Sequence, residues 1–157
     1  MPPHQIVSDE QRLSKLSKNL NEAIADVDLP LQYVFSNHLV LAGAGHVENS
    51  VLAILAEYCR QHSNIPIKRY VAKTVSRNNS LNCEKIKSIS DDFDTSWWPE
   101  IINSTGQNVR DSIDSLKTLR DQIAHGKMNG TGITVVSQYC SDARIFVRKY
   151  SEIVLGP

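Results

Sequence analysis

The chain has few cysteines, and they form no pattern. Its 157 residues include only Cys59, Cys83 and Cys140, an odd number of widely separated thiols. An odd number excludes complete pairing into disulfides, and the spacing matches neither a zinc site nor a redox motif. Because their neighbours are apolar, we expect three reduced thiols in the protein core and a cytoplasmic location.

The chain also lacks net charge, since 17 Lys and Arg residues balance 17 Asp and Glu residues. This balance excludes a positive field around the whole molecule, so any affinity for RNA must come from local patches. No apolar run approaches the length of a membrane-spanning helix, and the N-terminus lacks the hydrophobic segment of a secretory signal. We therefore expect no membrane partner.

The remaining composition is that of an ordinary globular protein, with 41% hydrophobic and 22% charged residues. A chain of this length can bury a core as one domain, here residues 1–157. Its apolar residues recur at helical spacing, and only residues 132–136 show a trace of strand-like alternation. These patterns predict an all-α fold, a compact bundle of about five to seven helices.

The first half of the chain contains signals for the ends of three helices. Ser8 and Gln11 form a capping-box pattern at the start of the first helix, which ends before a proline. A second helix is predicted over residues 31–42 and a third over residues 46–62. We interpret the glycine-containing segment 43–45 between them as a helix–helix turn, because it is too short for a phosphate-binding loop.

The second half begins with a short predicted helix over residues 67–78, and residues 79–107 are the least regular part. Asn108 is suited to cap the next helix. A turn-rich connection, residues 126–132, leads to a final helix whose apolar face runs from Val136 to Val154.

The helix after Asn108 ends with an arginine, Arg120, and a histidine five residues later, His125. At about 100° per residue, Arg120 falls within about 20° of Val109, inside the apolar stripe of this helix. That stripe consists of Val109, Ile113, Leu116, Leu119 and Ile123. Because a guanidinium keeps its charge, burying one without a partner is costly, which favours a functional site. The alternative is that Arg120 snorkels to solvent and His125 caps the last turn before Gly126.

A misplaced acid matches this misplaced base. Glu48 lies about 100° from Val47, within the broad apolar arc of the helix over residues 46–62. We predict a bidentate Glu48–Arg120 ion pair, which would satisfy both charges. The pair either orients Arg120 in a functional site or merely stabilises the bundle. Side chains on separate faces would contradict it.

The residues Arg120, Asp121 and His125 at a helix end resemble the active-site signature of the HEPN superfamily. Its members are compact α-helical domains, and many are metal-independent ribonucleases in toxin, antiviral and RNA-processing systems. Residues 41–48 are similar to the branch associated with RiboL-PSP proteins, and the resemblance covers about residues 31–154. Some members have lost catalysis and bind nucleotide, RNA or a protein partner, and this alternative stays open.

The resemblance implies catalytic roles for Arg120 and His125, with no metal and no cofactor. An RNA substrate, a homodimer and an antitoxin or regulatory partner are also implied. The residue chemistry agrees, because imidazole transfers protons near neutral pH and a guanidinium matches phosphate oxygens. Asp121 lies four residues before His125, where it either sets the imidazole tautomer or is a solvated acid.

One geometric difficulty concerns the spacing of the two catalytic candidates. Residues five apart on an ideal helix differ by about 140°, so Arg120 and His125 would diverge. Either Gly126 unwinds the last turn and brings His125 back, or two motifs face one cleft in a two-fold dimer.

A basic segment is the candidate RNA-binding surface. Residues 60–87 contain seven Lys and Arg residues and one acid, Glu84. Three of these cations are spaced by four residues and form a helical stripe: Arg69, Lys73 and Arg77. Such a stripe either follows RNA phosphates or is an ordinary solvated helix face.

Three further residues have two interpretations each. Trp97 and Trp98 either stack on unpaired bases or pack in the core. His46 either contributes to the site or has a capping or surface role.

Overall fold

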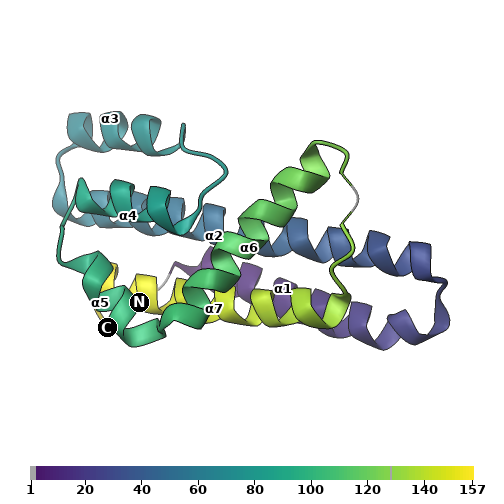
Figure 1. Cartoon of the computed structure of the whole chain (residues 1–157). Coiled ribbons are helices and arrows are strands. Elements are labelled where there is room, and N and C mark those ends of the chain that lie inside the picture. Colours follow the sequence, from purple (N-terminus) through teal and green to yellow (C-terminus); the bar gives the residue numbers. More distant parts are fainter. Residues whose placement is uncertain (1–2, 128) are drawn as a thin grey trace.

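The computed structural model describes residues 3–127 and 129–157 (Figure 1). Over these residues the chain forms seven α-helices and one short 3-10 helix, without a strand, so the predicted all-α bundle is confirmed. The elements are α1 (His4–Ala23), η1 (Ile24–Asp26), α2 (Leu29–His62), α3 (Ile65–Val75), α4 (Cys83–Asp91), α5 (Trp97–Thr105), α6 (Gln107–Ala124) and α7 (Ile133–Leu155).

The helix α2 is continuous, so the predicted turn at residues 43–45 is wrong. Gly43 is instead buried where α2 approaches α6 and α7. A Cβ atom added there would lie 2.6 Å from Cys140 Sγ and 3.3 Å from Leu116 Cδ1. The glycine therefore allows close helix packing, which offsets its poor helix propensity of about 1 kcal/mol.

Two other predicted helix starts also need correction. The helix α1 begins at His4 after Pro3 and has no side-chain cap, so Ser8 lies inside the helix and forms no capping box. The helix α3 begins at Ile65, where the Asn64 side chain accepts a hydrogen bond from the Ile67 amide at 3.2 Å. Proline in the first turn of α3 fits this start, because its missing N–H is not needed there.

The second half is more regular than predicted. Residues 79–107 contain α4 and α5, and residues 132–136 enter α7 rather than a strand. The helix α6 begins after Gly106, whose φ of 84° suits glycine, and Asn108 does not cap it.

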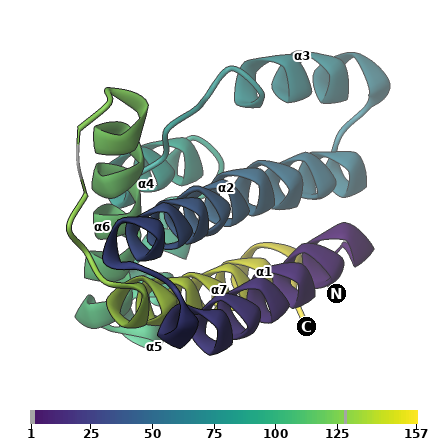
Figure 2. The ribbon, with the colours of Figure 1, turned by 90° about the vertical axis from the view of Figure 1, so that its right-hand side faces the viewer.

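The core lies where α2 and α7 pack along each other, with α1 beside them and α6 crossing on the other side (Figures 1 and 2). The predicted face of α7 is confirmed, since Val136, Phe146 and Tyr150 are each at most 1% exposed. The Tyr150 hydroxyl lies 2.7 Å from Ser90 Oγ, so its burial leaves no polar atom unpaired. Burying each large apolar side chain contributes about 1.5–3 kcal/mol.

The aromatic pair and the cysteines belong to this core. Trp97 and Trp98 are each 6% exposed, which supports the packing interpretation and leaves no ring face for a base. Cys59, Cys83 and Cys140 are buried free thiols, as predicted.

One described helix, α2, is long and apolar enough to cross a membrane by length and composition, although no such stretch was predicted. Half of its most apolar 18-residue window is buried inside the bundle. A core helix of this kind meets the same criteria.

Candidate functional site

The end of α6 is a glycine-terminated helix cap. The His125 amide donates to the Asp121 carbonyl at 3.0 Å, as in a continuing helix. The Gly126 and Lys127 amides then donate back to the carbonyls of Ile123 and Gln122 at 3.0 and 2.9 Å, and Gly126 has a φ of 69°. This pattern is a Schellman motif and confirms that Gly126 ends the helix.

The cap leaves His125 near its helical position and exposed to solvent. The backbone changes direction at Gly126, one residue too late to return His125 toward Arg120. The expected unwinding of the last turn is therefore wrong, and the two side chains diverge along one helix by about 140°.

Arg120 is half-buried, with 35% of its side chain exposed, rather than enclosed in the core. The apolar stripe explains this difference. Val109, Ile113 and Leu116 are buried, whereas Leu119 and Ile123 are only partly buried, because the C-terminal turns of α6 extend past α2 (Figure 1). A helical wheel predicts the direction in which Arg120 points, but it does not show how far along α6 the neighbouring helix α2 covers that side.

The prediction of a direct Glu48–Arg120 ion pair is wrong, because no such pair forms among residues 3–127 and 129–157. Arg120 Nη1 instead lies 3.7 Å from Asp121 Oδ1, and the Lys117 ammonium pairs with the other oxygen of that carboxylate. Glu48 is half-buried and accepts a hydrogen bond from another segment.

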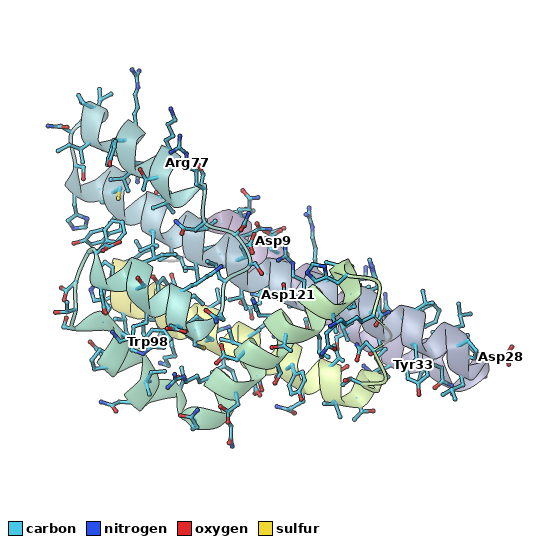
Figure 3. The ribbon with its side chains drawn as sticks, turned by 45° about the horizontal axis from the view of Figure 1, so that its top comes forward. Asp9, Asp28, Tyr33, Arg77, Trp98 and Asp121 are labelled. Atoms are coloured by element: carbon cyan, nitrogen blue, oxygen red, sulfur yellow. The ribbon has the colours of Figure 1, made fainter. Side chains whose placement is uncertain are left out.

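Ser80, in the loop between α3 and α4, connects the two acids. Its backbone N–H donates to Glu48 Oε2 at 2.6 Å, and its hydroxyl donates to Asp121 Oδ1 at 2.9 Å. Glu48 and Arg120 therefore belong to one polar cluster that we call the Ser80 cluster: Glu48, Ser80, Lys117, Arg120 and Asp121. Figure 3 shows the chain running from Arg77 toward Asp121.

Sequence reasoning missed Ser80. Its φ of 54° is unusual for a residue with a side chain and costs about 1–3 kcal/mol, a strain typical of functional segments. The only sequence signal is the polar turn Asn78-Asn79-Ser80, which does not predict contacts with two distant helices.

Asp121 has partners other than the expected imidazole. The hydrogen bond from Lys117, together with the one from Ser80, holds the pKa of the Asp121 carboxyl below its ordinary range. Its side chain makes no hydrogen bond to His125 within the described part of the chain. Asp121 therefore anchors the cluster and lies within ion-pair distance of Arg120, and a role in setting the His125 tautomer has no contact to support it.

The basic stripe divides between two segments. Arg69 and Lys73 lie on α3, and Arg77 lies beyond its end because α3 stops at Val75 rather than at residue 78. All three side chains are exposed. They form no ion pair with any described residue.

His46 is buried, with 5% exposure, and so has neither a capping nor a surface role. Its Nδ1 lies 3.4 Å from Ser50 Oγ, and Nε2 has no partner among the described residues. Burial lowers the pKa of this imidazole, which keeps it neutral. Being two residues before Glu48, it points about 200° away around α2 and lies outside the Ser80 cluster.

One described depression lies between α6 and α7, with a volume of about 290 Å³. It is lined by Asp114, Ser115, Thr118, Leu119, Thr131 and Tyr139. Within the described ranges, no three His, Cys, Asp or Glu side chains gather as metal ligands would. The Ser80 cluster presents the Arg120 guanidinium, and the exposed His125 imidazole lies outside it at the end of α6. These two groups suit phosphate binding and proton transfer.

Comparisons with known proteins agree with the helical fold. The model of the RiboL-PSP-HEPN family matches residues 4–156, which include α1 as well as the segment whose resemblance the sequence suggested. Searches of the curated proteins and of the solved structures found no significant match. With nearly its whole length matched, the chain is a HEPN-type module and belongs to the RiboL-PSP-HEPN family.

Proposed function

We propose that this HEPN-type module is a metal-independent endoribonuclease that acts in the cytoplasm as a toxin or antiviral defence effector. The supporting observation is the Ser80 cluster, in which Arg120 pairs with Asp121 at the end of α6, where His125 is exposed. An active ribonuclease must be restrained in its own cell, so an antitoxin or regulatory partner is part of the proposal.

The proposed reaction uses the RNA 2′-hydroxyl as the nucleophile. Its oxygen attacks the adjacent phosphorus, the bond from phosphorus to the 5′ oxygen breaks, and the products carry a 2′,3′-cyclic phosphate and a 5′-hydroxyl. His125 takes the proton from the 2′-hydroxyl or supplies one to the leaving oxygen. Arg120 stabilises the charge that develops on the phosphorane through N–H donors left free by Asp121.

A homodimer completes this site. Because Arg120 and His125 diverge on one helix, two motifs that meet across a two-fold axis supply both groups to one phosphate. The outward face of α2 supports this arrangement. Val34 and Leu41 are 56% and 45% exposed, and they lie seven residues apart on one side of α2. Glu48 follows Leu41 after another seven residues, so this exposed apolar side leads to the Ser80 cluster. We expect the dimer to bury Leu41.

The test is RNA cleavage by the purified protein in excess EDTA, comparing wild type with His125→Ala and Arg120→Ala. Arg12→Ala is the control, because Arg12 is an exposed cation on α1. Cleavage by wild type and the control alone, leaving 2′,3′-cyclic phosphate ends, supports the proposal. Equal cleavage by all four proteins contradicts it.

A second candidate is a non-catalytic module that binds nucleotide, RNA or a protein partner through the same cluster. The separation of Arg120 and His125 around one helix favours it, because a binding surface does not need both groups at one atom. In that case the same variants weaken binding by degrees, and no RNA product is formed by any of them.

A further inference from the structure

The helix α3 lies at the edge of the bundle and packs against α2 through one side (Figures 1 and 2). Val75 is buried and Val71 is half-buried on that side. The outward side carries Tyr70, which is 72% exposed, and Ile67, which is 50% exposed, lies at the border of the packed side, about 40° from Val71. Exposed apolar side chains of this size on one short helix indicate a contact surface.

The charge of α3 is entirely positive. The helix contains Lys68, Arg69 and Lys73 and no acid, and Arg77 follows it. None of these four cations forms an ion pair within residues 3–127 and 129–157, whereas Lys117, Arg144 and Arg148 are each paired with a carboxylate. The unneutralised charge of α3 therefore complements an anionic partner.

Tyr70 is placed among these cations. At about 100° per residue, Arg69 and Lys73 lie about 100° and 60° from Tyr70 around the helix. No aromatic ring or hydrogen-bonding group among the described residues contacts the Tyr70 side chain. Tyr58 is different, since its ring packs on His62 and Trp97 with centroids 4.2 and 4.9 Å apart.

The chain connects this surface directly to the Ser80 cluster. After α3 ends, Arg77 is followed three residues later by Ser80, which binds Glu48 and Asp121. An extended ligand that binds along α3 and past Arg77 therefore comes close to the end of α6.

We propose that the outward face of α3 binds single-stranded RNA, with an unpaired base stacked on Tyr70 and the flanking phosphates bound by Arg69 and Lys73. The inference deepens the proposed function and rests on RNA being the substrate. Single strands fit because their base faces are free to stack, whereas a duplex hides them. Tyr70 is a stacking residue, and Arg77 leads the strand toward the Ser80 cluster.

The experiment measures binding separately from cleavage. The full chain carrying His125→Ala is titrated against a fluorescent single-stranded oligoribonucleotide in EDTA, followed by anisotropy. Adding Tyr70→Ala is expected to weaken binding about 5- to 150-fold, the loss of one base–aromatic stack, while Tyr70→Phe stays near the parent. Ile67→Ala is the matched control, because it removes exposed apolar surface from α3 but no aromatic plane.

The salt dependence tests the cations. Lys73→Ala is expected to reduce the slope of log affinity against log salt by about 0.7, and Arg12→Ala to leave it unchanged. A blunt-ended RNA duplex of the same sequence is expected to bind more weakly and to be insensitive to Tyr70→Ala.

Three results would overturn the inference: equal affinity of the Tyr70→Ala and Tyr70→Phe proteins, a preference for the duplex, or tighter binding to phosphatidylserine vesicles than to RNA. Circular dichroism checks that each variant is folded. Tyr70-dependent binding without cleavage by wild type would uphold the inference and reject the nuclease. Cleavage with Tyr70-independent binding would do the reverse.

Discussion

Two groups of basic side chains in this molecule differ in what neutralises them. Between α1 and α7, Arg144 and Arg148 both donate hydrogen bonds to Oε1 of Glu10, and Glu10 is only 8% exposed. On α3, Arg69 and Lys73 face solvent without an acid. Burial alone would raise the pKa of Glu10, but hydrogen bonds from Arg148 and Arg144 hold it below its ordinary value.

The difference separates cations that hold the fold from cations that are available to a ligand. At the contact between α1 and α7, which we call the seam, the charges are paired within the protein, so removing one of them should lower stability. The edge formed by α3 and the end of α6 is open, so its loss should affect function. Each prediction below tests this separation, from the largest expected effect to the smallest.

Substitution at the open edge should abolish activity without unfolding the protein. We expect His125→Ala to lower RNA cleavage at least 100-fold, because proton transfer contributes about 10²–10⁴-fold. The melting temperature should stay within about 2 °C of wild type, since His125 is exposed. Cleavage and thermal denaturation of the same preparation check both, and a large fall in melting temperature would place His125 among the structural residues.

Substitution in the seam should have the opposite effect. We expect Glu10→Ala to lower the free energy of unfolding by about 1–3 kcal/mol, because two guanidiniums lose their shared acceptor. Partial exposure of both arginines limits the loss through solvent screening. Urea denaturation measures it, and Asp9→Ala is the control, since Asp9 pairs only with an exposed arginine at 3.6 Å. An unchanged midpoint for Glu10→Ala would show that the seam is not structural.

Stability should fall with acid in two steps. The pKa values of His46 and Glu10 are both lowered in the folded protein, so each contributes stability above its unfolded pKa that is lost as the pH falls. The first loss should begin near the ordinary imidazole value of 6.5, and the second below the ordinary carboxyl value of 4.5. In unfolding measured from pH 8 to 3, Glu10→Gln should reduce the second step and leave the first unchanged; the remainder of the second step comes from other carboxyls such as Asp121, whose pKa is also lowered. A second step of undiminished size would show that Glu10 does not contribute to it.

The smallest expected effect is at Ser80, which links the edge to the bundle. Ser80→Ala removes the side-chain hydrogen bond to Asp121 but keeps the hydrogen bond from the backbone N–H to Glu48. We therefore expect the free energy of unfolding to fall by about 0.5–1.5 kcal/mol. Cleavage should fall about threefold to tenfold, because the Asp121 carboxylate that pairs with Arg120 loses a hydrogen bond that holds it in place. Ser80→Gly should be more stable than Ser80→Ala, because glycine tolerates a φ of 54°. The reverse order would argue against backbone strain at this position.

Local signals in the sequence predicted several features correctly. The apolar period located α6 and α7, and Gly126 located the end of α6, because these features depend on residues within one helix. Buried positions such as Val109 and Val136 also followed from that period. The three buried thiols were predicted from their apolar neighbours.

The errors that concern Gly43 and the site arose where a residue has its partner on another element. Gly43 was interpreted as a turn, although its function is to let Cys140 and Leu116 approach. Glu48 and Arg120 were paired because both were misplaced, but only the fold shows that Ser80 and Asp121 connect them. No periodicity within α2 or α6 includes a loop residue more than 30 positions away.

The sequence by itself determined the all-α class, the apolar stripes of α6 and α7 and the family, because amphipathic spacing is a local property and the family pattern spans residues 4–156. Only the tertiary structure decided which charges are satisfied. An ion pair or hydrogen bond forms where two elements bring donor and acceptor within about 3 Å, and that distance depends on how the helices pack. Helix packing therefore pairs Glu10 with two arginines and leaves the cations of α3 open.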